Sequence, residues 1–127
     1  MSEFQGNAIT WFEIPVTDIQ RAVSFYEELL DAKLTPYSGS GEPYFIFPSS
    51  KGSVAGALVQ RADHKPAAQG TMVFLNADGN LDASLKRAEK LGTEILVPRT
   101  QVPGGTSYFA CLKDSEGNHV GLHSSMF

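Results

Sequence analysis

The chain lacks the features that mark several large classes of protein. It has one cysteine, Cys111, so it forms no intrachain disulfide and gives no sign of an oxidising compartment. No apolar run approaches the roughly 20 residues that a transmembrane helix needs. The first ten residues have neither the basic segment nor the apolar stretch of a secretory signal. We therefore expect a cytoplasmic protein that has no membrane partner.

Basic residues are also scarce. The 127 residues include 10 Lys or Arg against 14 Asp or Glu, which gives a net charge of −4. Nucleic acids attract proteins with a basic face, so this balance argues against a nucleic-acid partner. The sequence has no glycine-rich phosphate-binding motif, and no Ser-His-Asp or Cys-His arrangement has a supporting motif. The length fits one compact domain.

The chain contains two copies of one pattern. The segment "YFIFPSSKGSVAGALV" (44–59) resembles "YFACLKDSEGNHVGLHS" (108–124), and each copy is typical of a hairpin with a glycine in its turn. This alignment pairs Gly56 with Gly121. A strand and a helix precede each hairpin, because apolar residues recur at helical spacing after "IPVTD" and after "FLNADGN".

Each half therefore has the order β-α-β-β-β, as a repeat of one supersecondary unit. Module one extends over about 8–60, a polar linker over 61–70, and module two over about 70–125. A sheet with a helix on one face leaves the other face to a partner module or a ligand. The pattern predicts one α+β domain made of two tandem modules.

Two motifs carry a family resemblance. "VTDIQRAVSFYEELL" after the first strand and "DSEGNHVGL" near the end resemble the vicinal-oxygen-chelate superfamily. That superfamily includes glyoxalase I, bleomycin-resistance proteins, extradiol dioxygenases and fosfomycin-resistance enzymes. The resemblance covers nearly the whole chain. It implies that the sheets curl around a cup with the helices outside, often in a homodimer, and that enzymes of the family hold a divalent metal in the cup.

The resemblance also indicates where the metal ligands would lie, and this chain has other residues there. Counted from the motifs, the positions are Trp11, Gly56, Thr71 (or Met72, one step along) and Gly121. Divalent metals in such sites prefer imidazole or carboxylate ligands, which none of these residues provides. We therefore expect no cofactor, and the resemblance does not extend to glyoxalase I activity or metal-dependent dioxygenation.

Strand alternation indicates other candidates in the cup. Trp11 and Glu13 share one face of the first strand, while His119, Gly121 and His123 share one face of the last. Three interpretations of Glu13 and His123 stay open. They could form a structural pair, because a carboxylate in a cup needs a partner. They could form an acid/base or ligand-binding dyad, or a displaced metal site together with His119.

The most direct hypothesis is a protein that binds a small organic molecule in its cup without the usual metal. A glycine within a strand favours close approach of another group. The candidate ligand contacts are Trp11, Gly56, Thr71, His119 and Gly121. One alternative is a metal-independent isomerase or lyase with Glu13 and His123 as acid and base. A second alternative is a metal-dependent lyase or dioxygenase with shifted ligands.

We expect the purified protein to carry no stoichiometric Zn, Ni, Fe or Mn, because the four usual ligand positions lack imidazole and carboxylate groups. Elemental analysis after dialysis without chelator measures this. About one metal per chain, lost on His123→Ala, would support the displaced site instead.

Overall fold

Two modules with the same order of elements make up the chain, whose computed structural model describes residues 3–126. Module one contains β1 (Trp11–Pro15), α1 (Ile19–Leu30), β2 (Thr35–Pro36), β3 (Tyr44–Ile46) and β4 (Ala55–Val59). Module two contains β5 (Phe74–Asn76), α2 (Leu81–Lys90), β6 (Ile95–Gln101), β7 (Tyr108–Lys113) and β8 (His119–Ser124).

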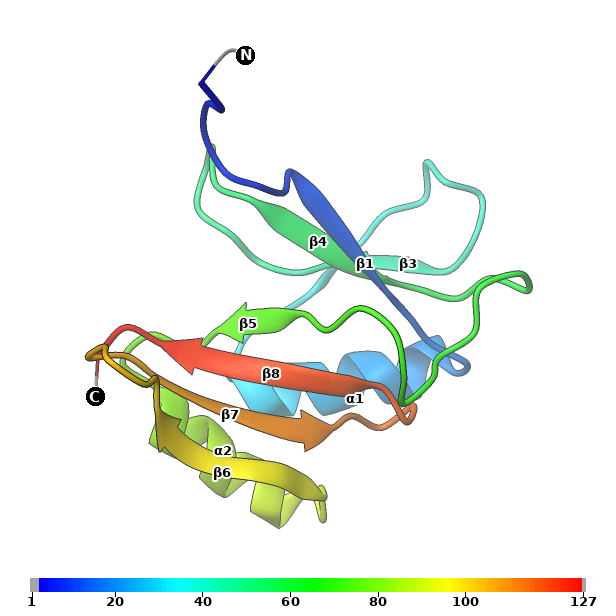
Figure 1. Cartoon of the computed structure of the whole chain (residues 1–127). Helices are drawn as coiled ribbons and strands as arrows, with labels where there is room; N and C mark the ends of the chain where they lie inside the picture. The colour runs from blue at the N-terminus through cyan, green and yellow to red at the C-terminus, as the bar shows by residue number, and fades with distance from the viewer. Residues whose placement is uncertain (1–2, 127) are drawn as a thin grey trace.

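Each module forms one four-stranded mixed sheet (Figure 1). The strand orders are β1-β4-β3-β2 and β5-β8-β7-β6. The first and last strands of a module pair in parallel, and the other neighbours pair antiparallel. Parallel pairing of β1 with β4 requires a crossover, and α1 lies within it. The predicted α+β fold of two tandem β-α-β-β-β modules is confirmed.

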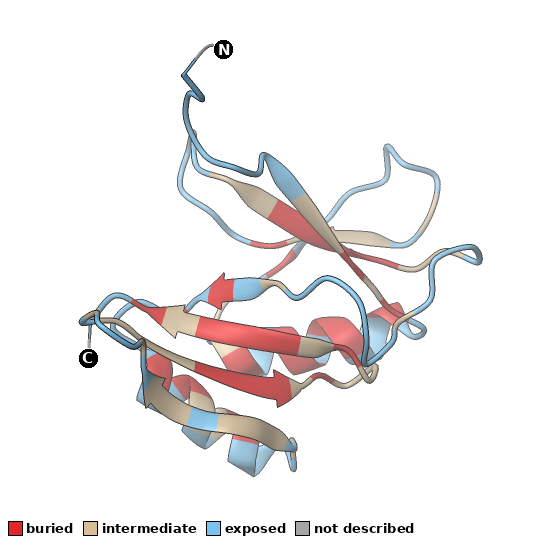
Figure 2. Cartoon of the chain, in the orientation of Figure 1, coloured by how far each residue is buried: buried red, intermediate tan, exposed pale blue. Residues whose placement is uncertain are grey.

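Helix α1 follows directly from its sequence. Asp18 is its N-cap, and the Oδ1 atom of Asp18 accepts a hydrogen bond from the backbone N of Arg21 at 3.1 Å. Asp31 ends the helix in the left-handed conformation, with a φ of 51°. Apolar residues at helical spacing face the core (Figure 2), namely Ile19, Ala22, Val23, Phe25, Tyr26 and Leu29.

The two modules share a repeated backbone contact that fixes their structural alignment. The backbone N of Val16 donates to the carbonyl O of Val59 at 3.0 Å, and the N of Ala77 donates to the O of His123 at 2.8 Å. Val59 and His123 are therefore equivalent. It follows that the counterpart of Gly121 is Ala57.

The predicted pairing of Gly56 with Gly121 is thus wrong by one residue. Gly56 lies opposite Phe12, and Phe12 packs against the helix-covered core. Gly121 lies opposite Phe74, which is on the other face of its sheet, because the adjacent Leu75 and Leu122 are the core residues there. Each glycine leaves room for the ring of a neighbouring phenylalanine, but the two rings lie on opposite faces of their sheets.

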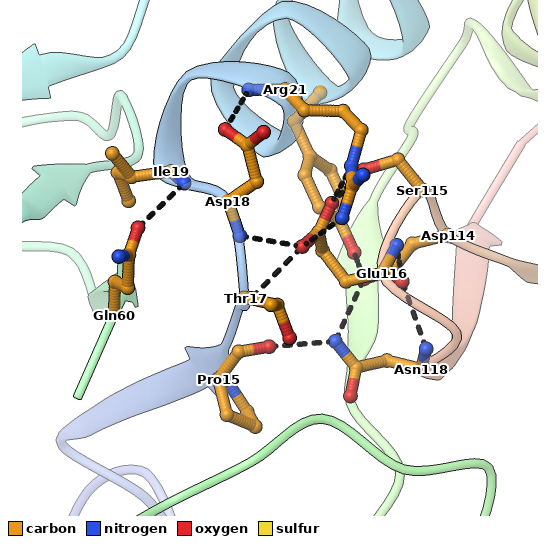
Figure 3. Close-up of polar contacts among 11 residues, drawn as sticks. Pro15, Thr17, Asp18, Ile19, Arg21, Gln60, Asp114, Ser115, Glu116 and Asn118 are labelled. Atoms are coloured by element: carbon orange, nitrogen blue, oxygen red, sulfur yellow. Dashed lines mark hydrogen bonds and ion pairs between the residues drawn. The ribbon is translucent and has the colours of Figure 1, made fainter. Parts of the chain in front are cut away.

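The two motifs that carry the family resemblance meet at the junction of the modules. Asp114 begins the turn between β7 and β8, and its Oδ1 accepts the backbone N–H groups of Glu116 and Asn118, both at 2.8 Å. Its Oδ2 accepts the hydroxyl of Tyr26 in α1 at 2.6 Å. Asn118 Nδ2 donates to the carbonyl O of Pro15 in β1 at 2.8 Å (Figure 3). The turn of module two therefore holds both β1 and α1 of module one.

Glu116 supplies the acceptor for the start of α1. Its Oε1 accepts the backbone N–H groups of Thr17 and Asp18, both at 2.8 Å, and its Oε2 lies 2.6 Å from Arg21 Nε (Figure 3). The Glu116 side chain is 0% exposed. Burial acts to raise the pKa of Glu116, but the bonds from Arg21 and the two backbone groups outweigh it and lower the pKa to about 2.

We expect Glu116→Gln to reduce the free energy of unfolding by about 1–2 kcal/mol at neutral pH. The lowered pKa in the folded state means that Glu116 stabilises the fold above its unfolded pKa of 4.5. This contribution falls as pH drops from there towards about 2. Urea titrations of wild type and variant between neutral and acid pH should therefore converge at low pH.

Glu94→Gln is the matched control, since Glu94 pairs with Lys113 at 3.4 Å on the exposed surface. We expect a loss below about 0.5 kcal/mol for that pair. A Glu116→Gln loss as small as the control, or one that does not change with pH, would contradict the assigned role of Glu116.

Candidate functional site

Each sheet has one face against the helices and one open face. On the first sheet, Phe12 and Ile14 belong to the core side of β1, so Trp11 and Glu13 lie on the open face. The same alternation places Tyr44 on the open face of β3. Strand β4 lies between β1 and β3, so side chains of these two strands face each other across β4.

A chain of hydrogen bonds connects these open-face side chains. Trp11 Nε1 donates to the hydroxyl of Tyr44 at 2.9 Å, and that hydroxyl donates to Glu13 Oε2 at 2.9 Å. Arg61 Nη1 donates to Glu13 Oε1 at 2.7 Å. Arg61 Nε and Nη2 both donate to Glu42 Oε1, at 3.1 and 2.6 Å. We call these five residues the Glu13 cluster.

The charges in the Glu13 cluster stabilise one another. The hydrogen bond from Arg61 lowers the pKa of Glu13, against the opposing effect of burial. The bonds to Glu42 and then Glu13 raise the pKa of Arg61. Burial, followed by the bond to Glu13, raises the pKa of Tyr44. Glu13 is therefore ionised at neutral pH and is a poor proton donor there.

The structure does not bring Glu13 and His123 together within one chain. Within residues 3–126, the hydrogen bonds of the Glu13 carboxylate go to Arg61 and Tyr44, and none goes to His123. His123 lies on the open face of the second sheet, opposite Asn76 and Phe109. The roles of Glu13 and His123 as acid and base stay predictions.

The space expected above the two strand glycines is filled by the chain's own aromatic rings. A Cβ atom on Gly56 would lie 2.3 Å from the Phe12 ring, and one on Gly121 would lie 2.2 Å from the Phe74 ring. Gly56 is on the core side of its sheet, so the expectation that it opens the cup to a ligand is wrong. Gly121 does lie on the open face, beneath Phe74.

The structural alignment also moves, by one residue, two of the four positions that the resemblance assigns to metal ligands. Because Val16 and Ala77 are equivalent, the counterpart of Trp11 is Met72. Thr71 is exposed and lies outside β5. The positions that the resemblance implies thus become Trp11, Ala57, Met72 and Gly121, whose side chains contain no imidazole or carboxylate group. Among residues 3–126, no three His, Cys, Asp or Glu side chains gather closely enough to hold a metal ion.

A groove of about 940 Å³ lies between the modules, bordered by β1, β5 and the segment that precedes β5. Its size falls in the range of roughly 300–1,000 Å³ that is usual for small-molecule sites. Four exposed apolar side chains line it: Ile9, Trp11, Met72 and Phe74. Glu13 and His119 also line the groove, whereas His123 does not. The groove thus contains several of the predicted ligand contacts.

Sequence reasoning missed three members of the Glu13 cluster. Tyr44 has a readable signal, because alternation from the core residue Phe45 places it on the open face. Arg61 and Glu42 lie outside the strands, one in the segment after β4 and the other in the loop before β3. Loop and linker positions have no periodic pattern, so only the fold reveals these partners.

The comparison with protein families identifies the class of protein. The profile of the Glyoxalase/Bleomycin resistance protein/Dioxygenase superfamily matches residues 8–122. The chain belongs to this superfamily. A comparison with curated protein sequences gives no match.

Solved structures with the same fold span nearly the full chain. A glyoxalase/bleomycin resistance protein from Catenulispora acidiphila is 24% identical, with a TM-score of 0.65 over 90% of this chain and 95% of the other. TnmS3, an antibiotic binding protein from a Streptomyces species, is 22% identical, with a TM-score of 0.65 over 96% and 98%. FosX, a fosfomycin resistance protein from Listeria monocytogenes, is 14% identical, with a TM-score of 0.67 over 98% and 94%.

Neither helix in the described part of the chain has the length and apolar character needed to cross a membrane.

We expect Gly56→Ala to destabilise the protein more than Gly121→Ala. Phe12 packs against the core and Phe47, so a Cβ on Gly56 forces overpacking that costs about 1–3 kcal/mol. Phe74 is 49% exposed, so its ring can move outward from a new Cβ on Gly121. Urea denaturation of both variants measures the difference.

Gly105→Ala is the control, because a Cβ there comes no closer than 3.6 Å to any atom outside the two neighbouring residues in the chain. A Gly56→Ala protein as stable as this control would contradict the predicted clash with Phe12.

Proposed function

We propose that the protein binds a small organic molecule in the groove and on the open face of the first sheet, without the usual divalent metal. The observation that carries this proposal is the exposed Trp11 ring, whose indole N–H is held by Tyr44 at the edge of the groove. The ring is 42% exposed. A large apolar side chain that is both oriented and exposed beside a groove is typical of a ligand contact.

The similar structures support this class of function. TnmS3 is named as an antibiotic binding protein and FosX as a fosfomycin resistance protein. For this chain we propose a binding protein of the same general kind, with Trp11, Met72, Phe74 and His119 among its ligand contacts. Thr71 stays a candidate contact, since it borders the same groove.

The enzyme alternatives have less support. A metal-independent isomerase or lyase would need Glu13 to exchange a proton, but Arg61 and Tyr44 hold its carboxylate and Arg61 lowers its pKa. A carboxylate held in this way suits electrostatic recognition better than general acid catalysis. A metal-dependent enzyme with shifted ligands would need Glu13 and His123 to be brought together.

We also propose a homodimer, through a surface other than the groove. Strands β2 and β6 each end their sheet and present an edge to which another chain can pair. A two-fold axis would join the same surface of both copies and leave no open series of contacts. Sedimentation velocity should give the mass of a dimer at micromolar concentration. A monomer at high micromolar concentration would exclude the dimer without excluding ligand binding.

We expect a ligand found in a thermal-shift screen of metabolites and antibiotics to change the fluorescence of the chain's single tryptophan. Binding at about 100 times Kd should add about 2.7 kcal/mol to stability. Trp11→Ala should weaken binding at least about tenfold, since it removes one of the two exposed aromatic rings that line the groove.

Leu91→Ala is the control for that substitution, because Leu91 is an exposed apolar residue outside the groove. Equal loss of affinity in both variants, or ligand binding that leaves tryptophan fluorescence unchanged, would show that the ligand site lies elsewhere.

A further inference from the structure

We propose that the Glu13 cluster is a subsite for the protonated amine of a ligand whose planar aromatic ring stacks beside Trp11. This inference rests on the proposed function, since it specifies the class of molecule that the open face accepts. The aromatic rings, the charge and the free hydrogen-bond acceptors of module one all favour a ligand of this class.

The rings around the Glu13 cluster are fixed by their polar ends. The Trp11 N–H and the Tyr44 hydroxyl bind each other, and Tyr44 also donates to Glu13. Tyr37, which is 49% exposed, packs edge-on against Tyr44 with ring centroids 5.6 Å apart. The hydrogen bonds hold the Trp11 and Tyr44 rings in one orientation, so a flat ligand can stack on them with little ordering cost.

The charge of the cluster favours a cation. Two carboxylates, Glu13 and Glu42, share the one guanidinium of Arg61, which leaves a net charge of −1. In addition to Arg61, the basic residue His64 lowers the pKa of Glu13 by its electrostatic interaction. A cation near these carboxylates can also interact with the faces of the neighbouring aromatic rings.

The Glu13 cluster has carboxylate oxygens that can still accept hydrogen bonds from a ligand. Both bonds from Arg61 to Glu42 go to Oε1, and within the described residues no hydrogen bond is recorded to Glu42 Oε2. Carboxylate oxygens have further lone pairs that an ammonium group, with three donors, can use. The side chains of Glu13, Glu42 and Arg61 are each more than a quarter exposed, so a ligand can reach them.

The second sheet offers no equivalent feature. Its four strands contain no Asp or Glu, and its open face presents Phe74 against Phe109 with ring centroids 6.1 Å apart. An aromatic ligand could contact either open face, but only the first sheet places carboxylates beside the rings. Selection for an amine is therefore a property of module one.

A matched set of probes tests this inference on the full chain. Naphthylmethylamine, naphthylmethanol and naphthoate share one ring system and differ in charge, and tryptophan quenching or calorimetry follows their binding. At about pH 8, above the usual range of histidine titration, the amine should bind about tenfold more tightly than the alcohol, a difference of about 1.4 kcal/mol. Naphthoate should bind more weakly than either.

Glu42→Gln isolates the contribution of charge. It should reduce the preference for the amine to about threefold or less while leaving affinity for the alcohol unchanged, because it removes one carboxylate charge and no ring. Glu94→Gln removes an exposed carboxylate from the other module and should keep the wild-type preference. Added salt should reduce the preference in wild type even if Glu42→Gln proves unstable.

Each other outcome has a distinct meaning. Tightest binding of naphthoate would overturn the inference and make Arg61 the anchor. Equal binding of all three probes would show that charge is not recognised. If no probe binds but the thermal-shift screen finds a ligand, this inference fails and the proposed function stands. If neither experiment finds a ligand, both fail.

Discussion

The arrangement of the two modules depends on one turn, the segment of module two that begins at Asp114. The first turn of any helix exposes backbone N–H groups that need acceptors. In α1 the cap residue Asp18 satisfies one of them, and Gln60 satisfies the N–H of Ile19 at 2.8 Å. Glu116 binds the N–H groups just before the helix from the other module (Figure 3). The start of α1 is therefore completed only when the modules are packed together.

The same turn sets the position of the open face. Asn118 holds the carbonyl of Pro15 at the end of β1, and the alternation of that strand then places Trp11 and Glu13 opposite the core side. Gly117, between Glu116 and Asn118, has a φ of 90°, which an L side chain rarely adopts. The turn motif and the helix motif that suggested the superfamily are thus in direct contact with each other. The buried hydrogen bond from Tyr26 to Asp114 connects them in the core.

The sequence predicts the fold well because the fold depends on local periodicity. The helical spacing of α1 and the repeat of hairpins are both readable without long-range information. Register is different, since a one-residue error in a strand moves every side chain to the other face. The pairing of Gly56 with Gly121 failed in this way, and it placed Gly56 in the cup although Phe12 covers it on the core side. Partners from loops, such as Arg61, could not be predicted at all, because a salt bridge between 13 and 61 leaves no periodic trace in either segment.

Two of the positions that the resemblance assigns to metal ligands are covered by other parts of the chain. Ala57 in β4 is 0% exposed, and the hydrogen bond from Tyr44 to Glu13 joins the strands on either side of it. Gly121, at the equivalent position in β8, lies under the Phe74 ring. A side chain at Gly121 would meet the Phe74 ring unless that ring moved. The rings and the paired charges together define the surface that the proposed ligand would meet. It is aromatic and acidic in module one, whereas in module two it combines the Phe74–Phe109 pair with the imidazoles of His119 and His123.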